Sequence, residues 1–75
     1  MSKRDSVLVA LGLSVRQHRE ACELTQESLA ERAELDQTYI SGIECGRRNP
    51  GIKNVVRIAK ALKIATSELL RGVDE

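Results

Sequence analysis

The segment 36–41 concentrates polar and aromatic side chains where the apolar spacing predicts the start of a short helix. Gln37 and Thr38 occupy its first turn, with Tyr39 and Ser41 close behind. A glutamine amide can form two hydrogen bonds to adenine, and a threonine can offer its hydroxyl or contact a thymine methyl group. If this helix enters a major groove, the four residues are candidates for contacts to DNA bases. Otherwise they are exposed polar residues, and Tyr39 packs its ring on the edge of the core.

Basic residues follow this segment. The whole chain has a formal net charge of only +1, but residues 35–63 hold six basic and two acidic side chains. A duplex carries one negative charge per about 1.7 Å, so cations gain affinity by displacing its counterions. Alternatively, these basic residues only form a solvent-exposed face of the protein. Arg48 is also a candidate for insertion into a narrowed minor groove. The candidates for contacts to the DNA backbone are Arg47, Arg48 and Asn49 in a loop, and Lys53 and Asn54 in the next predicted helix.

Catalytic and metal-binding chemistry finds no support in the sequence. The single histidine, His18, belongs to no Ser/His/Asp or Cys/His set, and no carboxylate pair indicates acid–base catalysis. Cys22 and Cys45 stand in no metal-binding spacing, so two free thiols are expected. The apolar segment 7–13 lacks a signal-peptide cleavage site and is too short to span a bilayer. We therefore expect a cytoplasmic protein without enzymatic activity, cofactor, metal, membrane partner or small-molecule effector.

The composition favours an all-α fold. The 75 residues are 41% hydrophobic and 31% charged, and Tyr39 is the only aromatic residue. Packing must therefore come from Leu, Ile, Val and Ala, which suits helices better than a sheet. The length predicts a single domain over residues 1–75, with its core at about 6–71. A domain of this size is marginally stable unless a partner helps.

Apolar residues recur at helical spacing in five segments separated by short polar connections. Four of these segments begin near side chains that can accept from free N–H groups: Asp5 or Ser6, Thr25, Asp36, and Thr66 or Ser67. Gly46 follows the third segment, where a left-handed residue ends a helix, and Pro50 prevents fusion with the fourth. The predicted helices cover about residues 6–22, 26–33, 37–45 and 52–62, and a short fifth carries Leu69 and Leu70.

Several motifs at fixed spacing resemble the Cro and phage-repressor (Xre-type) family of DNA-binding domains. They lie at residues 24–30, 33–35, 39–46, 50 and 58–62. The resemblance spans about residues 8–71 and implies a five-helix, lambda-repressor-like bundle whose second and third helices form a helix-turn-helix. It also implies a transcriptional regulator that binds double-stranded DNA, as a homodimer on a pseudo-palindromic operator. Residues 36–44 followed by Arg48 and Asn49 are most similar to the controller proteins of restriction–modification systems. A prophage Cro-like repressor, an antitoxin and a protein-docking module of the same fold remain alternatives.

The resemblance also implies roles for single residues. Gln26 matches the family glutamine that bonds a phosphate and braces the recognition helix. Arg19 and Glu44 match a partly buried salt bridge, which would make both residues structural. Gly42 departs from the phage repressors, where a longer polar side chain can reach a base. Because glycine inside a helix costs about 1 kcal/mol relative to alanine, its presence needs a reason, such as close approach of the backbone to DNA.

Two further features point to stabilisation by a second copy. Glu23, Glu34 and Lys63 stand where the family usually has glycine. A non-glycine residue held at positive φ costs about 1–2 kcal/mol, so these helix ends differ or the domain alone is less stable. The predicted last two helices also carry more apolar surface than one small core needs, unless the monomer core buries it. The candidates for an isologous dimer interface are Val56, Leu69, Leu70 and Val73.

Overall fold

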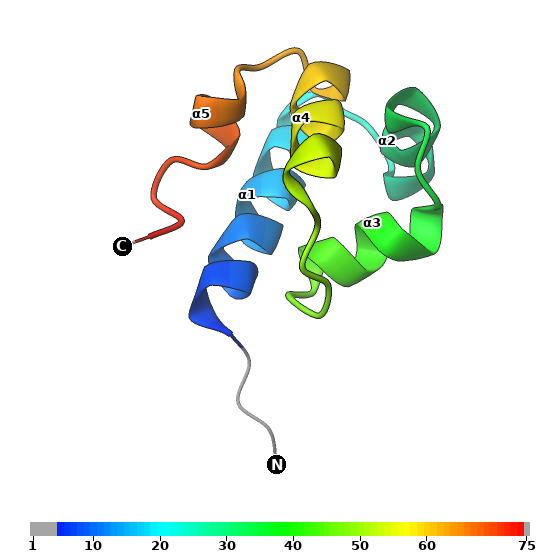
Figure 1. Cartoon of the computed structure of the whole chain (residues 1–75). Coiled ribbons are helices and arrows are strands. Elements are labelled where there is room, and N and C mark those ends of the chain that lie inside the picture. Colours follow the sequence, from blue (N-terminus) through cyan, green and yellow to red (C-terminus); the bar gives the residue numbers. More distant parts are fainter. Residues whose placement is uncertain (1–4, 75) are drawn as a thin grey trace.

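The computed structural model describes residues 5–74, so the expected domain limits, residues 1 and 75, lie outside the described residues. Over that range the chain forms five α-helices and no strand, which confirms the predicted all-α bundle. Figure 1 shows α2 and α3 together on one side of α4, with α5 on the other side next to α1. The helices are α1 (Ser6–Ala21), α2 (Gln26–Ala33), α3 (Gln37–Glu44), α4 (Ile52–Ala61) and α5 (Thr66–Leu69).

Side-chain caps fix the starts of the first three helices. The Asp5 carboxylate accepts from the backbone N–H of Val7 at 2.8 Å, and the Asp36 carboxylate accepts from that of Thr38 at 2.7 Å. At α2 the Thr25 hydroxyl accepts from the Ser28 N–H at 3.0 Å. These bonds satisfy N–H groups that have no partner inside the helix.

The fifth helix begins differently from the prediction. Ala65 occupies the cap position of α5 and makes no side-chain hydrogen bond, while Thr66 lies inside the helix as its first residue. The expectation that Thr66 or Ser67 caps this helix is therefore wrong. Two adjacent hydroxyl residues allow several registers, and a helix of four residues has too little apolar periodicity to select one.

The core is aliphatic and draws on every helix. Val15 of α1, Leu29 of α2, Ile40 of α3 and Ile58 of α4 are at most 1% exposed. Ser14 is the one buried polar residue in the described part of the chain, and its hydroxyl donates to the backbone carbonyl of Leu69 at 2.6 Å. This bond ties α5 to α1 across 55 residues of sequence.

The predicted dimer interface is wrong at one residue, Leu69. It is 0% exposed and belongs to the core, so it cannot lie in an interface between two copies. Leu69 is the last residue of α5 and Leu70 is its C-cap. Successive helical residues point about 100° apart, so only one of these two leucines can face the core completely. The other three candidates, Val56, Leu70 and Val73, are partly exposed.

Three helix ends have the left-handed geometry for which the family uses glycine. Glu23, Glu34 and Lys63 have φ values of 59°, 58° and 61°. The residue after each donates its N–H back into the helix, as Leu35 does to the Ala30 carbonyl at 2.9 Å. These backbone hydrogen bonds close a helix whatever the side chain is. The three residues therefore keep the left-handed conformation although their Cβ atoms make it strained. Gly46, with φ 75°, adopts the left-handed conformation predicted for it.

A glycine that belongs to no motif of the sequence allows α1 to approach α3. Gly12 is buried in α1, and a Cβ there would collide with the backbone carbonyl oxygens of Ile43 and Glu44. Those atoms cannot move without shifting α3 itself. Gly12 therefore sets the distance between the central helix and the predicted recognition helix.

None of the helices described over residues 5–74 is long and apolar enough to cross a membrane.

Candidate nucleic-acid interface

Helices α2 and α3 are separated by residues 34–36 and form a helix-turn-helix (Figure 1). Gln37 and Thr38, in the first turn of α3, are exposed, while Tyr39 and Ser41 are partly buried. Asp36 caps the helix through the Thr38 N–H, so the backbone of this turn is fixed without using the side chain of Gln37 or Thr38. The side chains of Gln37 and Thr38 are therefore available to a ligand that approaches the first turn of α3.

Tyr39 connects three elements of the predicted interface. Its hydroxyl oxygen accepts from the Asn54 side-chain amide of α4 at 3.1 Å. The guanidinium carbon of Arg48 lies 5.8 Å from the centre of its ring, within the range of a cation–π contact. Tyr39 is therefore neither fully exposed nor part of the buried core. Its side chain joins α3 to Arg48 of the following loop and to Asn54 of α4.

The loop after α3 folds back on that helix. The backbone N–H groups of Arg47 and Arg48 both donate to the Gly42 carbonyl, at 2.9 and 3.2 Å. Arg47, Arg48 and Asn49 are exposed, as is Lys53 in the first turn of α4. Within residues 5–74, no carboxylate lies within ion-pair distance of these three cations. Their charges are not neutralised inside this part of the chain and gather beside α3.

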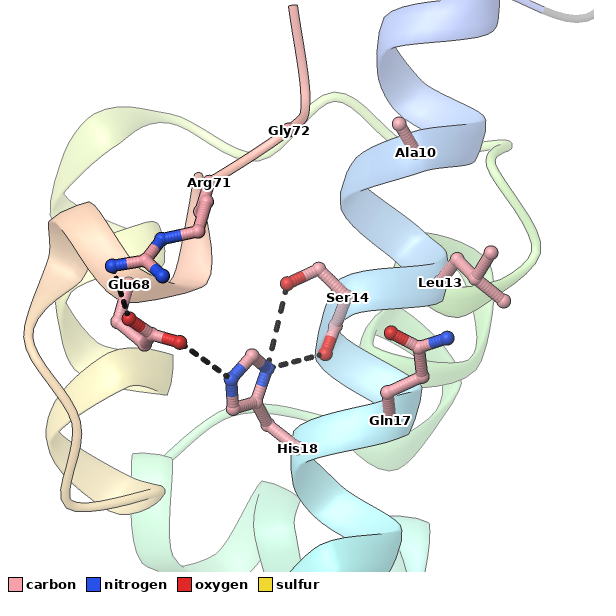
Figure 2. A pocket seen from close by; sticks show the side chains of 8 residues that line it. All are labelled: Ala10, Leu13, Ser14, Gln17, His18, Glu68, Arg71 and Gly72. Carbon is pink, nitrogen blue, oxygen red and sulfur yellow. Dashed lines mark hydrogen bonds and ion pairs between the residues drawn. The ribbon is translucent and has the colours of Figure 1, made fainter. Parts of the chain in front are cut away.

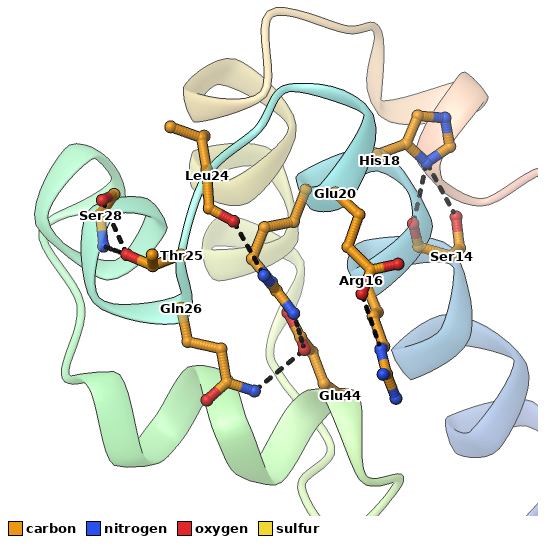
Figure 3. Close-up of polar contacts among 10 residues, drawn as sticks. Ser14, Arg16, His18, Glu20, Leu24, Thr25, Gln26, Ser28 and Glu44 are labelled. Carbon is orange, nitrogen blue, oxygen red and sulfur yellow. Dashed lines mark hydrogen bonds and ion pairs between the residues drawn. The ribbon is translucent and has the colours of Figure 1, made fainter.

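A largely buried ion pair at the end of α3 ties this helix to α1, and Gln26 of α2 joins it (Figure 3). Arg19 of α1 donates to both carboxylate oxygens of Glu44, from Nε at 2.7 Å and from Nη2 at 3.0 Å, and to the Leu24 carbonyl at 2.8 Å. The side chains of Arg19 and Glu44 are 12% and 4% exposed. The hydrogen bonds to Glu44 raise the pKa of Arg19, against the opposing effect of burial. Both residues of the expected salt bridge are thus used inside the fold.

Gln26 joins the same cluster. Its side-chain nitrogen donates to Glu44 Oε1 at 3.0 Å, which fixes the side chain at the start of α2 (Figure 3). An amide nitrogen carries two hydrogens, so one N–H remains after this bond. The N-terminus of a helix attracts anions through its free N–H groups and dipole. Gln26 therefore braces α3 through Glu44, and its second side-chain N–H is not used by this bond.

A hollow lies between α1 and the segment 68–72 (Figure 2). Its lining residues come from α1 and this segment, and none belongs to α3. His18 Nδ1 donates to the Ser14 carbonyl at 2.9 Å, and His18 Nε2 lies 3.8 Å from Glu68 Oε2. Glu68 also pairs with Arg71 at 3.1 Å. The charged groups here are paired with one another. No cluster of three metal-ligating side chains occurs anywhere in residues 5–74.

Comparison with known proteins agrees with this geometry. Residues 15–69 match the model of a helix-turn-helix family. The chain is 40% identical over 57 residues to control protein C.MunI of Mycoplasma sp, covering 76% of this chain and 77% of that protein. It is 39% identical over 67 residues to control protein C.BamHI of Bacillus amyloliquefaciens, covering 88% and 83%.

A solved structure extends the likeness to the fold. The restriction–modification controller protein C.AhdI from Aeromonas hydrophila matches with a TM-score of 0.82 and 42% identity, over 83% of this chain and 94% of that one. Residues 15–69, which the family model matches, include the turn between α2 and α3 and the residues Arg19, Gln26 and Glu44. The chain therefore belongs to the helix-turn-helix family of DNA-binding transcriptional regulators, a non-enzymatic family, and is of the restriction–modification controller type.

Proposed function

We propose that this protein regulates transcription in the cytoplasm by inserting the first turn of α3 into the major groove of a specific DNA site. The observation that carries the proposal is the contrast between the buried and the exposed residues of α3. Ile40, Ile43 and the Glu44 carboxylate are held inside the fold. Gln37 and Thr38 in the first turn are exposed, and the three cations described above have no ion-pair partner within residues 5–74. A rigid helix with free polar side chains and flanking positive charge suits the recognition of bases on a polyanion.

The proposed contacts divide into two classes. Gln37, Thr38, Tyr39 and Ser41 contact bases, because they belong to the first turns of α3. The contacts to the DNA backbone come from residues that precede or follow α3 in the sequence. Such contacts fix the position of the protein on the duplex without selecting the base sequence. Those residues are Gln26, Arg47, Arg48, Asn49, Lys53 and Asn54.

We further propose that two copies bind one pseudo-palindromic site. Val56, Leu70 and Val73 are partly exposed apolar residues of α4 and the segment that begins at α5. Pairing these surfaces about a two-fold axis would remove apolar area from water and offset the marginal stability of so small a domain. Two recognition helices held about 34 Å apart would then face successive major grooves.

The test is a gel-shift titration with the DNA upstream of the protein's own gene and with a scrambled duplex, at about 50 and 200 mM salt. A dimer that uses three cations per copy makes about six phosphate contacts, so the higher salt should weaken binding about a thousandfold. Gln37→Ala should reduce the preference for the specific duplex by about 1–3 kcal/mol. Arg48→Ala should weaken binding to both duplexes equally.

Gln17→Ala is the matched control for Gln37→Ala, since Gln17 is also an exposed glutamine but lines the hollow beside α5. This variant should bind as the wild type does. A folded protein that shows no preference over scrambled DNA would contradict the proposal. Salt-independent binding to a protein would instead favour a docking module of the same fold.

A further inference from the structure

The glycine inside the recognition helix is explained by a side chain from the following loop. Gly42 is the sixth of the eight residues of α3. A Cβ built there would lie 2.6 Å from Arg48 Cγ, 3.6 Å from Arg48 Nε and 3.7 Å from Arg48 Cβ. The aliphatic part of Arg48 therefore crosses α3 in the space that any other residue at position 42 would occupy.

Contacts at both ends hold Arg48 in that place. At the backbone, its N–H donates to the Gly42 carbonyl at 3.2 Å, next to the similar bond from Arg47. At the tip, its guanidinium carbon lies 5.8 Å from the centre of the Tyr39 ring. Tyr39 precedes Gly42 by three residues, so both lie on one face of α3. The hydrogen bond from Asn54 holds the Tyr39 hydroxyl at the far edge of the ring.

We propose that Gly42 is a positioning residue: its missing side chain lets Arg48 lie across α3 and stack on Tyr39 before any DNA is bound. This differs from the expectation that the backbone at Gly42 approaches DNA closely. The position of Arg48 follows from the contacts within the chain, and its effect on affinity rests on the proposed function. A long side chain that is already ordered loses less conformational freedom on binding, so the guanidinium reaches its phosphate or groove at lower entropic cost.

The first test needs no DNA and uses the fact that Tyr39 is the only aromatic residue in the chain. The only other ring that carries a ring current is the imidazole of His18, which contacts Ser14 and Glu68 in the hollow beside α5. A ring-current shift of the Arg48 side-chain protons is therefore assigned to Tyr39, and Tyr39→Leu checks the assignment. In the wild type these NMR signals should lie upfield of their random-coil positions. In Gly42→Ala and in Tyr39→Leu they should return toward random-coil values. Wild-type signals at random-coil positions, or unchanged upfield shifts in Gly42→Ala, would overturn the proposal.

Loss of folding is a separate and measurable outcome. Alanine has a higher helix propensity than glycine, so Gly42→Ala should melt at or above the wild-type temperature once Arg48 has moved aside. Gly51→Ala is the matched control, because a Cβ at Gly51 meets no atom within 4 Å. It should leave the Arg48 signals unchanged. A melting temperature well below wild type for Gly42→Ala would show that Arg48 cannot yield and would overturn the proposal.

The second test is a double-mutant cycle on DNA affinity. Gly42→Ala should weaken binding about fivefold, the scale of a lost cation–π contact. The double variant Gly42→Ala/Arg48→Ala should bind as Arg48→Ala alone, because without the Arg48 side chain nothing is left for Gly42 to position. Losses that multiply would mean that Gly42 acts on DNA directly, which overturns the proposal. If the wild type binds no duplex, the proposed function fails, while the NMR test of the Arg48 position still decides this inference.

Discussion

At the scale of single residues, Glu44 supports the recognition helix more than any exposed side chain does. One carboxylate accepts from Arg19 of α1 and Gln26 of α2 while belonging to α3. Its side chain is 4% exposed, so water cannot replace a partner that is removed. Removing Arg19 or Glu44 would leave the other as an uncompensated buried charge. The hydrogen bonds to Glu44 raise the pKa of Arg19, so this guanidinium keeps its positive charge at ordinary pH.

Glu44→Ala is therefore expected to lower the free energy of unfolding by about 3–5 kcal/mol, since it leaves the Arg19 guanidinium buried without its partner. Urea denaturation followed by circular dichroism measures this change. The control is Glu20→Ala, which removes a pair with Arg16 whose side chains are 56% and 59% exposed. That change should cost at most about 0.5 kcal/mol. Equal losses in the two variants would contradict a structural role for Glu44.

At the scale of elements, the helix ends carry strain that the fold tolerates. Glu34 ends α2 in the left-handed region with φ 58°, directly before the turn that leads to α3. The backbone bonds that close the helix do not need the glutamate side chain, and Glu34 is exposed. The conformation is thus retained for its hydrogen bonds, while the Cβ adds a cost that glycine would not.

We predict that Glu34→Gly raises the free energy of unfolding by about 1 kcal/mol. The control is Glu31→Gly, an exposed position inside α2 where glycine should lower stability by about 1 kcal/mol. Both values come from the same urea titrations. A loss of stability in Glu34→Gly would show that its side chain makes a contribution larger than the strain.

The elements also show how far sequence can predict this fold and site. The caps depend on one side chain and the two or three residues after it, so local chemistry was enough to predict Thr25 and Asp36. For the first helix it left Asp5 and Ser6 as alternatives, of which Asp5 is the cap. The burial of Leu69 was not predictable, because a one-turn helix gives too short a pattern to choose between two leucines.

The site was predictable only in part. Gln37 and Thr38 could be placed at the start of a helix from their neighbours alone. The contact between Arg48 and Gly42 depends on the path of the intervening loop, which no periodicity specifies. The only sequence signal was the energetic cost of a glycine in a helix, which indicates that some neighbour is close without naming it.

At the scale of the whole molecule, one aliphatic core supports a recognition helix at one side and leaves apolar side chains partly exposed at another. Val56 of α4 and Val73 after α5 are partly exposed, although each is a residue that proteins usually bury. A domain of this size has little stability to spare, so covering these residues with a second copy would increase it.

We expect the wild type to sediment as a dimer and Val56→Asp to sediment as a folded monomer, because a charge in the interface must be desolvated. Analytical ultracentrifugation gives the masses, and circular dichroism confirms folding. Val7→Asp places the same charge on an exposed valine in the first turn of α1, where a carboxylate is favourable, and should remain a dimer. A wild type that is monomeric at high concentration would contradict the proposed pairing.

The proposal that the first turn of α3 contacts DNA bases is tested by NMR titration of the labelled protein with the DNA upstream of its own gene. The largest chemical-shift changes should fall on the backbone amides of residues 36–41 and on the side-chain amides of Gln37 and Asn54. The side-chain amide of Gln17, beside α5, should not change. Changes concentrated on α1 and α5, with the first turn of α3 unaffected, would contradict it.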